Sequence, residues 1–300
     1  MRNSLLLFLM LNAITIALGW LTGGLSMELQ LGLAAVLIGL VGIPHGAIDH
    51  ILFLQNNKQT SSVKFYAFYF SLILLVILVW VYSPIIGLIG FLALSAYHFG
   101  QSQFARYKGI KKPVKVFLYS TWGMAILAGL CVFNQAEIQT ITSSAADLLK
   151  IKPVFEGTTF QSLLILCSIF FAAVILSYRN TLGWKTVLYE LAVFGLIQLS
   201  LVLNPLLIGF SIYFASLHSW HVLQQEFRFL SKRMKAFNWY NFVALLTPYT
   251  LVSLVGLVML LTLSHFKIIG VSKTLVVFIT ISALTLPHSV VMENFYNSTS

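Results

Sequence analysis

The sequence predicts an all-α, polytopic integral membrane helix bundle of about ten transmembrane helices, with both termini in the cytoplasm. Hydrophobic residues make up 59% of the 300 residues and charged residues only 9%, whereas soluble domains contain roughly 25% charged residues. Apolar stretches of the roughly 20 residues that cross a bilayer follow one another along the chain. We therefore expect one integral membrane domain over residues 1–300, located in the cell (inner) membrane with multiple passes.

Ten spans are expected from hydropathy, and turn-forming residues such as Ser83-Pro84 and Asn204-Pro205 separate them. The first is read as a retained span, because no clear small-residue cleavage site follows it. The long polar connection 134–157 contains SSAADLLK, which is compatible with a short interfacial helix. The predicted spans are 4–23, 29–54, 64–82, 84–107, 115–133, 158–178, 185–203, 205–230, 240–264 and 272–295.

The distribution of Lys and Arg predicts the orientation of these spans. Of the 18 basic residues, only Lys150, Lys152, Lys267 and Lys273 fall on the side opposite the termini. Basic residues are enriched in cytoplasmic loops, so both termini are expected inside the cell. The net charge of +10 is explained by these loops, and no nucleic-acid partner is expected.

Histidines form the most informative pattern, because six of the seven lie within or at the end of spans two, four, eight and ten. All four spans run from outside to inside, so the topology places the six imidazoles in the cytoplasmic half of the membrane. The seventh, His265, ends the ninth span on the outer side. Ionisable side chains in hydrocarbon are costly and usually functional, so a shared layer of imidazoles predicts a metal site.

Helical spacing refines this prediction. His218 and His221 are separated by three residues and are expected to face one point. Asp49, four residues after His45, is predicted as the catalytic carboxylate that accepts the second imidazole N–H. His50 points roughly 140° away from His45 in a helix, so it is expected at the interface rather than on the metal. The predicted metal ligands are His45, His98, His218, His221 and His288.

Several functions remain compatible with these residues alone. Imidazole ligands suit iron, copper, zinc or nickel, so both an oxygen-activating iron enzyme and a zinc hydrolase are possible. A bis-histidine haem electron carrier is an alternative, and so is a transporter, although acidic residues at the bilayer centre are sparse. Another histidine-metal membrane oxidase or desaturase is the nearest enzymatic alternative, but the HxxxH and HxxHH boxes of desaturases are absent.

The segments PHGAIDH, YHFGQSQF, FASLHS and LPHSVVM occur in this order and resemble the Brp/Blh family of membrane β-carotene 15,15′-dioxygenases over essentially the whole chain. The resemblance implies oxidative cleavage of the central double bond of all-trans-β-carotene by a non-haem Fe(II) centre. One O2 is consumed and two molecules of all-trans-retinal form, which commonly supply a microbial rhodopsin. Because β-carotene dissolves in membrane lipid, a site open laterally between helices is expected, with aromatic side chains around the polyene.

The same resemblance implies a ranking of the ligands. His45 and His98 match the first two iron-ligand positions, and span eight supplies a later one. His218 is the better match there, because His218 and His221 are one residue closer together than in the family's H-S-x-x-H arrangement. His288 is the alternative for the remaining ligand and ranks above His221.

Overall fold

A computed structural model of the chain describes residues 2–57 and 59–299, and within them it contains helices and no strand. Ten helical stretches are long and apolar enough to cross a membrane, which confirms the predicted number of spans. They are Asn3–Thr22, Met27–Asn56, Ser62–Tyr82, Pro84–Phe104, Lys112–Phe133, Thr159–Ser177, Trp184–Leu203, Leu206–Ser231, Trp239–His265 and Lys273–Ser298.

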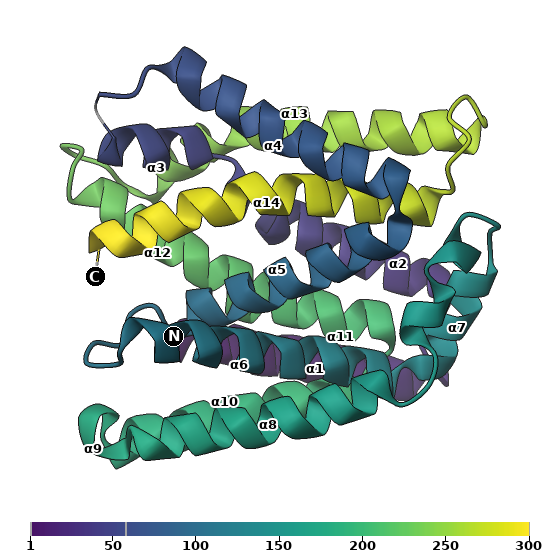
Figure 1. The fold of residues 1–300 in the computed structure, drawn as a ribbon, viewed down its shortest axis with the longest axis horizontal. Coiled ribbons are helices and arrows are strands. Elements are labelled where there is room, and N and C mark those ends of the chain that lie inside the picture. The colour runs from purple at the N-terminus through teal and green to yellow at the C-terminus, as the bar shows by residue number, and fades with distance from the viewer. Residues whose placement is uncertain (1, 58, 300) are drawn as a thin grey trace.

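The helices run roughly parallel to one long axis of the bundle (Figure 1). The start of α1 (Arg2–Thr22) and the end of α14 (Lys273–Thr299) lie at the same end, together with α9 (Arg179–Leu182). The helix α7 (Gln135–Ser143) lies at the opposite end. We call these the inner and outer ends, following the predicted orientation.

The centre of the bundle contains α5 (Pro84–Phe104) and α6 (Lys112–Phe133), which pack closely along their lengths. A Cβ atom on Gly100 would lie 2.1 Å from a backbone oxygen of α6, and one on Gly123 would lie 1.9 Å from a backbone oxygen of α5. Small residues allow such close approach of membrane helices. The position of α5, which carries His98, is therefore determined by its contact with α6.

Around this pair, α14 packs against both α4 (Ser62–Tyr82) and α13 (Trp239–His265). The indole nitrogen of Trp80 in α4 donates a hydrogen bond of 2.7 Å to the hydroxyl of Ser282 in α14. The other α-helices complete the bundle and its edges. They are α2 (Met27–Leu37), α3 (Asp49–Asn56), α8 (Thr159–Ser177), α10 (Trp184–Leu203), α11 (Leu206–Ile212) and α12 (Trp220–Ser231).

The spacing argument for His45 and Asp49 assumed a continuous α-helix in the second span, but the structure shows an interrupted one. After α2 the chain forms a π-helical turn, η1 (Ile38–Gly42), and then a 3-10 turn, η2 (Pro44–Gly46), before α3 begins. Proline has no backbone N–H to donate and clashes with the preceding turn of an α-helix. Pro44 therefore coincides with the point where the regular helix is interrupted.

The eighth span is interrupted as well, because a seven-residue π-helix, η5 (Tyr213–Ser219), separates α11 from α12. Short π-helical turns within α-helices are rare and are frequently found at functional sites. Both interruptions fall on segments that carry a histidine of the predicted site.

The connection between spans five and six is organised differently from the expectation. Its α-helix is α7, which ends at the first residue of SSAADLLK. That segment itself forms only the 3-10 turn η3 (Leu148–Lys150), and a second 3-10 turn, η4 (Lys152–Phe155), follows it. Together these elements cover the outer end of the bundle beside α6 (Figure 1).

Candidate metal centre

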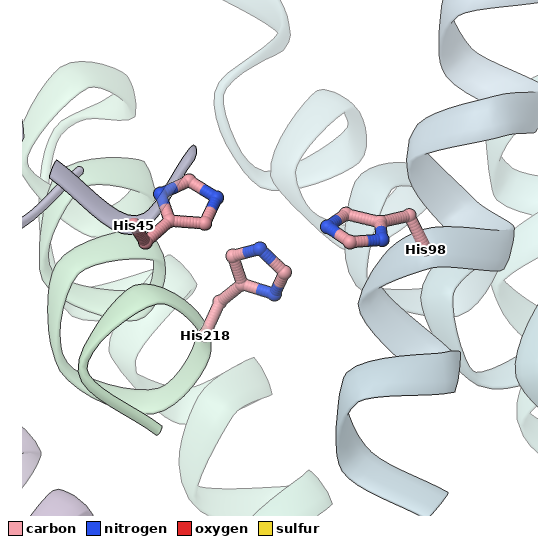
Figure 2. Close-up of side chains that lie close together, drawn as sticks. All are labelled: His45, His98 and His218. Carbon is pink, nitrogen blue, oxygen red and sulfur yellow. The ribbon is translucent and has the colours of Figure 1, made fainter. Parts of the chain in front are cut away.

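Three buried histidines meet in the interior of the bundle. His45 belongs to η2, His98 to α5 and His218 to η5, and one ring nitrogen of each lies within 4.8 Å of those of the other two. Figure 2 shows the three rings around one common space, each from a different segment. Segments far apart in the sequence thus bring imidazole groups close enough to hold one metal ion.

His288 of α14 adds a fourth ring to this group. Its ring centroid lies 4.9 Å from that of His45 and 4.9 Å from that of His98. The side chain is buried like the other three. A haem bound by two of these histidines does not fit here. The other two rings occupy the space around the iron that the porphyrin ring would need.

Asp49 contacts His288 rather than His45, so the prediction from helical spacing is wrong in this detail. Its Oδ1 lies 2.8 Å from Nδ1 of His288, and the Tyr69 hydroxyl donates a 3.0 Å hydrogen bond to its Oδ2. Nδ1 of His45 instead contacts the backbone carbonyl oxygen of Gly42. The prediction fails because His45 lies in a 3-10 turn that ends at Gly46, and a non-helical turn separates it from the start of α3 at Asp49.

His218 is also held by an oxygen acceptor. Its Nδ1 lies 3.0 Å from Oγ of Ser102, whose hydroxyl donates to the backbone carbonyl of Phe99. The Ser102 oxygen is therefore available to accept from the imidazole N–H. In three of the four histidines Nδ1 thus contacts an oxygen, the arrangement that orients metal-binding histidines.

The remaining ring nitrogens point to a bound ion. Nε2 of His218, Nε2 of His288 and both nitrogens of His98 are buried and have no hydrogen-bond partner within residues 2–57 and 59–299. Buried polar atoms are almost always partnered, and here four unpartnered nitrogens lie in one group of adjacent imidazole rings, which fits a shared bound ion. Neutral imidazole nitrogens are good donors to iron, copper, nickel and zinc, and the group therefore fits a transition metal.

Gly42 explains how His45 and His218 come together. A Cβ atom at this position would lie 2.9 Å from the ring of Phe214 in η5, so only glycine lets the two π-helical turns approach. The ring centroids of His45 and His218 are 5.2 Å apart as a result. Hydropathy does not reveal a π-helical turn. The feature of the sequence that marks this interruption is Pro44, which follows Gly42 by two residues.

The other three histidines are not part of the group. His221 does not face the same point as His218, as its spacing had predicted, and its Nε2 lies 2.7 Å from the amide nitrogen of Gln225. The change from π- to α-helix between the two histidines alters their relative direction. His50 contacts the ring of Tyr249 at 4.6 Å, and His265 contacts only the adjacent Phe266 ring among the described aromatic residues, at the outer end of α13.

A second polar group, centred on the carboxylate of Glu293, connects two of the histidine-bearing helices. Gln101 donates a hydrogen bond to Glu293, and the Tyr97 hydroxyl donates to the same carboxylate at 2.8 Å. Gln101 lies one helical turn after His98, and Glu293 follows His288 by five residues. These contacts join α5 to α14 near the cluster and hold His98 and His288 in register.

A cavity of about 650 Å³ borders all four clustered histidines. Apolar and aromatic side chains form nearly all of its wall, including Phe99 and Phe214, whose rings lie 4.8 Å and 5.3 Å from that of His218. Ligand pockets of proteins fall in this size range. The arrangement can therefore bring a hydrophobic molecule beside a histidine-bound metal.

A protein-family model described as Beta-carotene 15,15'-dioxygenase matches residues 36–296. The matched region includes the four clustered histidines, Asp49 and the helices that line the cavity. No curated protein and no solved structure matches the chain.

Proposed function

The chain belongs to the beta-carotene 15,15'-dioxygenase family, and from that premise we propose that it cleaves the central double bond of all-trans-β-carotene with O2. Each of the two carbons of the broken double bond receives one oxygen atom, so the products are two molecules of all-trans-retinal and no further reductant is needed. The observation that supports this proposal is the buried histidine cluster beside a large apolar cavity. We propose that the protein resides in the inner cell membrane.

We propose that Fe(II) is the metal and that it is held by His45, His98, His218 and His288. The unpartnered nitrogens of this cluster support the choice of ligands, and iron bound by histidines with an open coordination position would supply O2 activation. Four neutral imidazoles leave a positive charge in a low-dielectric interior. The carboxylate of Asp49, which contacts His288, offsets part of that charge.

The protein's own residues contribute positioning and exclusion of water. The cavity wall contains few polar groups, so a polyene can displace water there at little cost. Phe99 and Phe214 lie against the His218 ring and would hold the central bond of the polyene beside the metal. Retinal leaves into the same lipid from which the carotene came, and a microbial rhodopsin is a fitting consumer of it.

Expression in β-carotene-producing cells tests the function directly. We expect the cells to lose their orange colour and to accumulate two molecules of retinal for each carotene consumed, as measured by chromatography. Unchanged carotene in the presence of the folded, iron-loaded protein would contradict the proposal. A strong Soret band in the purified protein would indicate the haem alternative instead.

Removing the Asp49 carboxylate is expected to weaken metal binding. In Asp49→Ala we expect the affinity for iron to fall by roughly 10–100-fold, the usual effect of losing an outer partner of a metal-bound histidine. The measurement is the iron content after dialysis against a graded series of chelator concentrations. Tyr69→Phe is the control, because it keeps the carboxylate on His288 and removes only the 3.0 Å contact behind it. Equal iron affinities for Asp49→Ala and the wild type would contradict this role.

A further inference from the structure

Part of the cavity wall near the histidines is exposed at the side of the bundle. The exposed residues in its wall come from α4, α13 and α14, and they include Phe70 (62% exposed), Val252 (73%) and Leu284 (42%). Because α4 and α13 both pack on α14, we interpret these exposed residues as the rim of a lateral opening between the three helices. We call this opening the mouth.

From the histidines a second part of the same cavity extends toward the outer end of the bundle. Its wall there comes from the outer ends of α5, α6, α11 and α14 and from α7 and η4. None of these residues is exposed, and the innermost are nearly inaccessible, with Thr142 at 3%, Ile138 at 7% and Cys131 at 9%. We call this closed part the outer arm, which is lined at its end by Leu88, Cys131, Ile138, Thr142, Phe155 and Leu206.

The end wall of the outer arm is thin. Cys131, Ile138 and Phe155 also line a separate small pocket of about 10 Å³, on whose other side lie Gly157 and Gln161. A single layer of side chains therefore separates the arm from that pocket. Changing one of these side chains alters the depth of the arm without touching a histidine.

The depth of the outer arm matches half of a carotene molecule. Leu88 precedes His98 by ten residues of α5, which corresponds to about 15 Å along the helix axis. In an extended chain each bond advances by about 1.2 Å. The roughly nine bonds from the central carbon of β-carotene to its ring thus cover about 11 Å, and the ring fills the remaining length.

The chemistry of the outer arm fits a hydrocarbon ring. The Thr142 hydroxyl donates to the carbonyl of Ile138 at 2.8 Å, so its proton is not available to a ligand. The other residues at the end are apolar apart from the Cys131 thiol, which behaves as a small hydrophobe. A methylated cyclohexene ring without polar substituents, such as the end ring of β-carotene, can fill this space without burying an unpaired polar group.

From these observations we infer that the closed end of the outer arm determines which double bond is cleaved. A carotene enters from lipid through the mouth, and its leading ring stops against Cys131, Ile138 and Phe155. The central bond then lies beside the histidines. This inference rests on the proposed function. A shallower or deeper arm would place a neighbouring double bond there, and the same addition of one O2 would yield one shorter and one longer carbonyl fragment.

Two variants change the depth of the arm in opposite directions. Ile138→Trp fills the end, and Phe155→Ala opens it toward the small pocket. Successive double bonds of the polyene lie about 2.5 Å apart, so either change is large enough to move the chain by one double bond. Leu203→Trp is the matched control, because it adds the same bulk to an exposed residue at the outer end of α10.

The test measures products by mass spectrometry and carotene binding by absorbance. We expect off-centre fragments from at least one of the two variants, with retinal alone from the wild type and Leu203→Trp. In His98→Ala protein, which keeps the arm, we expect carotene binding to be weakened by adding Ile138→Trp and unchanged by adding Leu203→Trp.

Two kinds of failure can be told apart. Retinal as the only product of both arm variants, or no product from either while the wild type is active, would overturn the role of the arm. If the wild type binds carotene but cleaves no carotenoid, the proposed function fails and the assignment of bond selection falls with it.

Discussion

Replacement of His98 by alanine is expected to abolish both metal binding and carotene cleavage. The side chain is buried and neither ring nitrogen has a hydrogen bond of ordinary geometry within the described residues, so its removal disturbs at most a weak contact with the Gln101 side chain. The loss of a ligand should reduce metal affinity by more than the roughly 100-fold that an outer partner can cost. The measurements are metal per protein after purification and retinal formed in β-carotene-producing cells.

His98 is a cleaner test than the other three histidines. Removing His218 would leave Ser102 without its contact, and removing His288 would leave the buried Asp49 carboxylate without its imidazole partner. Both variants would therefore lose stability as well as metal. His98→Ala separates the two effects, provided that its thermal unfolding stays near that of the wild type.

Two alanine variants serve as controls for this prediction. His265→Ala, at the outer end of α13, is expected to retain metal and activity. His221→Ala is expected to retain metal too, because its ring contacts Gln225 and lies outside the cluster. Loss of metal in His265→Ala would contradict the assignment of the site, and loss of metal in His221→Ala would restore His221 as a ligand.

Gly100→Ala is expected to destabilise the protein and to reduce metal binding, although it adds one methyl group. The new Cβ would lie 2.1 Å from a backbone oxygen of α6, so α5 and α6 must move apart. Overpacking of this kind costs about 1–3 kcal/mol and sometimes more. The displacement acts on His98 two residues away and on Ser102, which contacts His218.

The matched control is Gly90→Ala in the same helix. Nothing lies within 4 Å of a Cβ atom at Gly90, so this change is expected to leave stability unchanged or to raise it by about 0.5–1 kcal/mol. Thermal unfolding in detergent and metal content are the measurements. Equal unfolding temperatures for Gly100→Ala and Gly90→Ala would show that the close approach of α5 and α6 does not matter.

The topology could be read from the sequence because it depends on local properties. The ten spans follow from runs of apolar residues, because segments of this length and composition are stable only when buried in a membrane or a large core. Their alternation then places His45, His98, His218 and His288 in one layer, and the structure brings these four rings together. The depth of a residue in the membrane depends only on its position along its span, and the ends of each span can be located by hydropathy.

The partners within the site could not be read in this way, because they depend on where regular helix geometry stops. The spacing rules placed Asp49 beside His45 and pointed His221 at the cluster, and both expectations assumed an uninterrupted α-helix. The π-helical turns η1 and η5 and the 3-10 turn η2 invalidate that assumption. Such turns are stabilised by packing between segments, here by the contact of Gly42 with Phe214.

The class of protein, the number of spans and the depth shared by the histidines thus follow from the order of residues along the chain. Which histidines converge, which oxygens orient three of their rings, and which side chains line the adjoining cavity depend on the packing of the helices in three dimensions. The physical reason is the range of the interactions. Hydrophobic burial and charge placement act on each segment separately, whereas ligand geometry results from close contacts between helices that are distant in the chain.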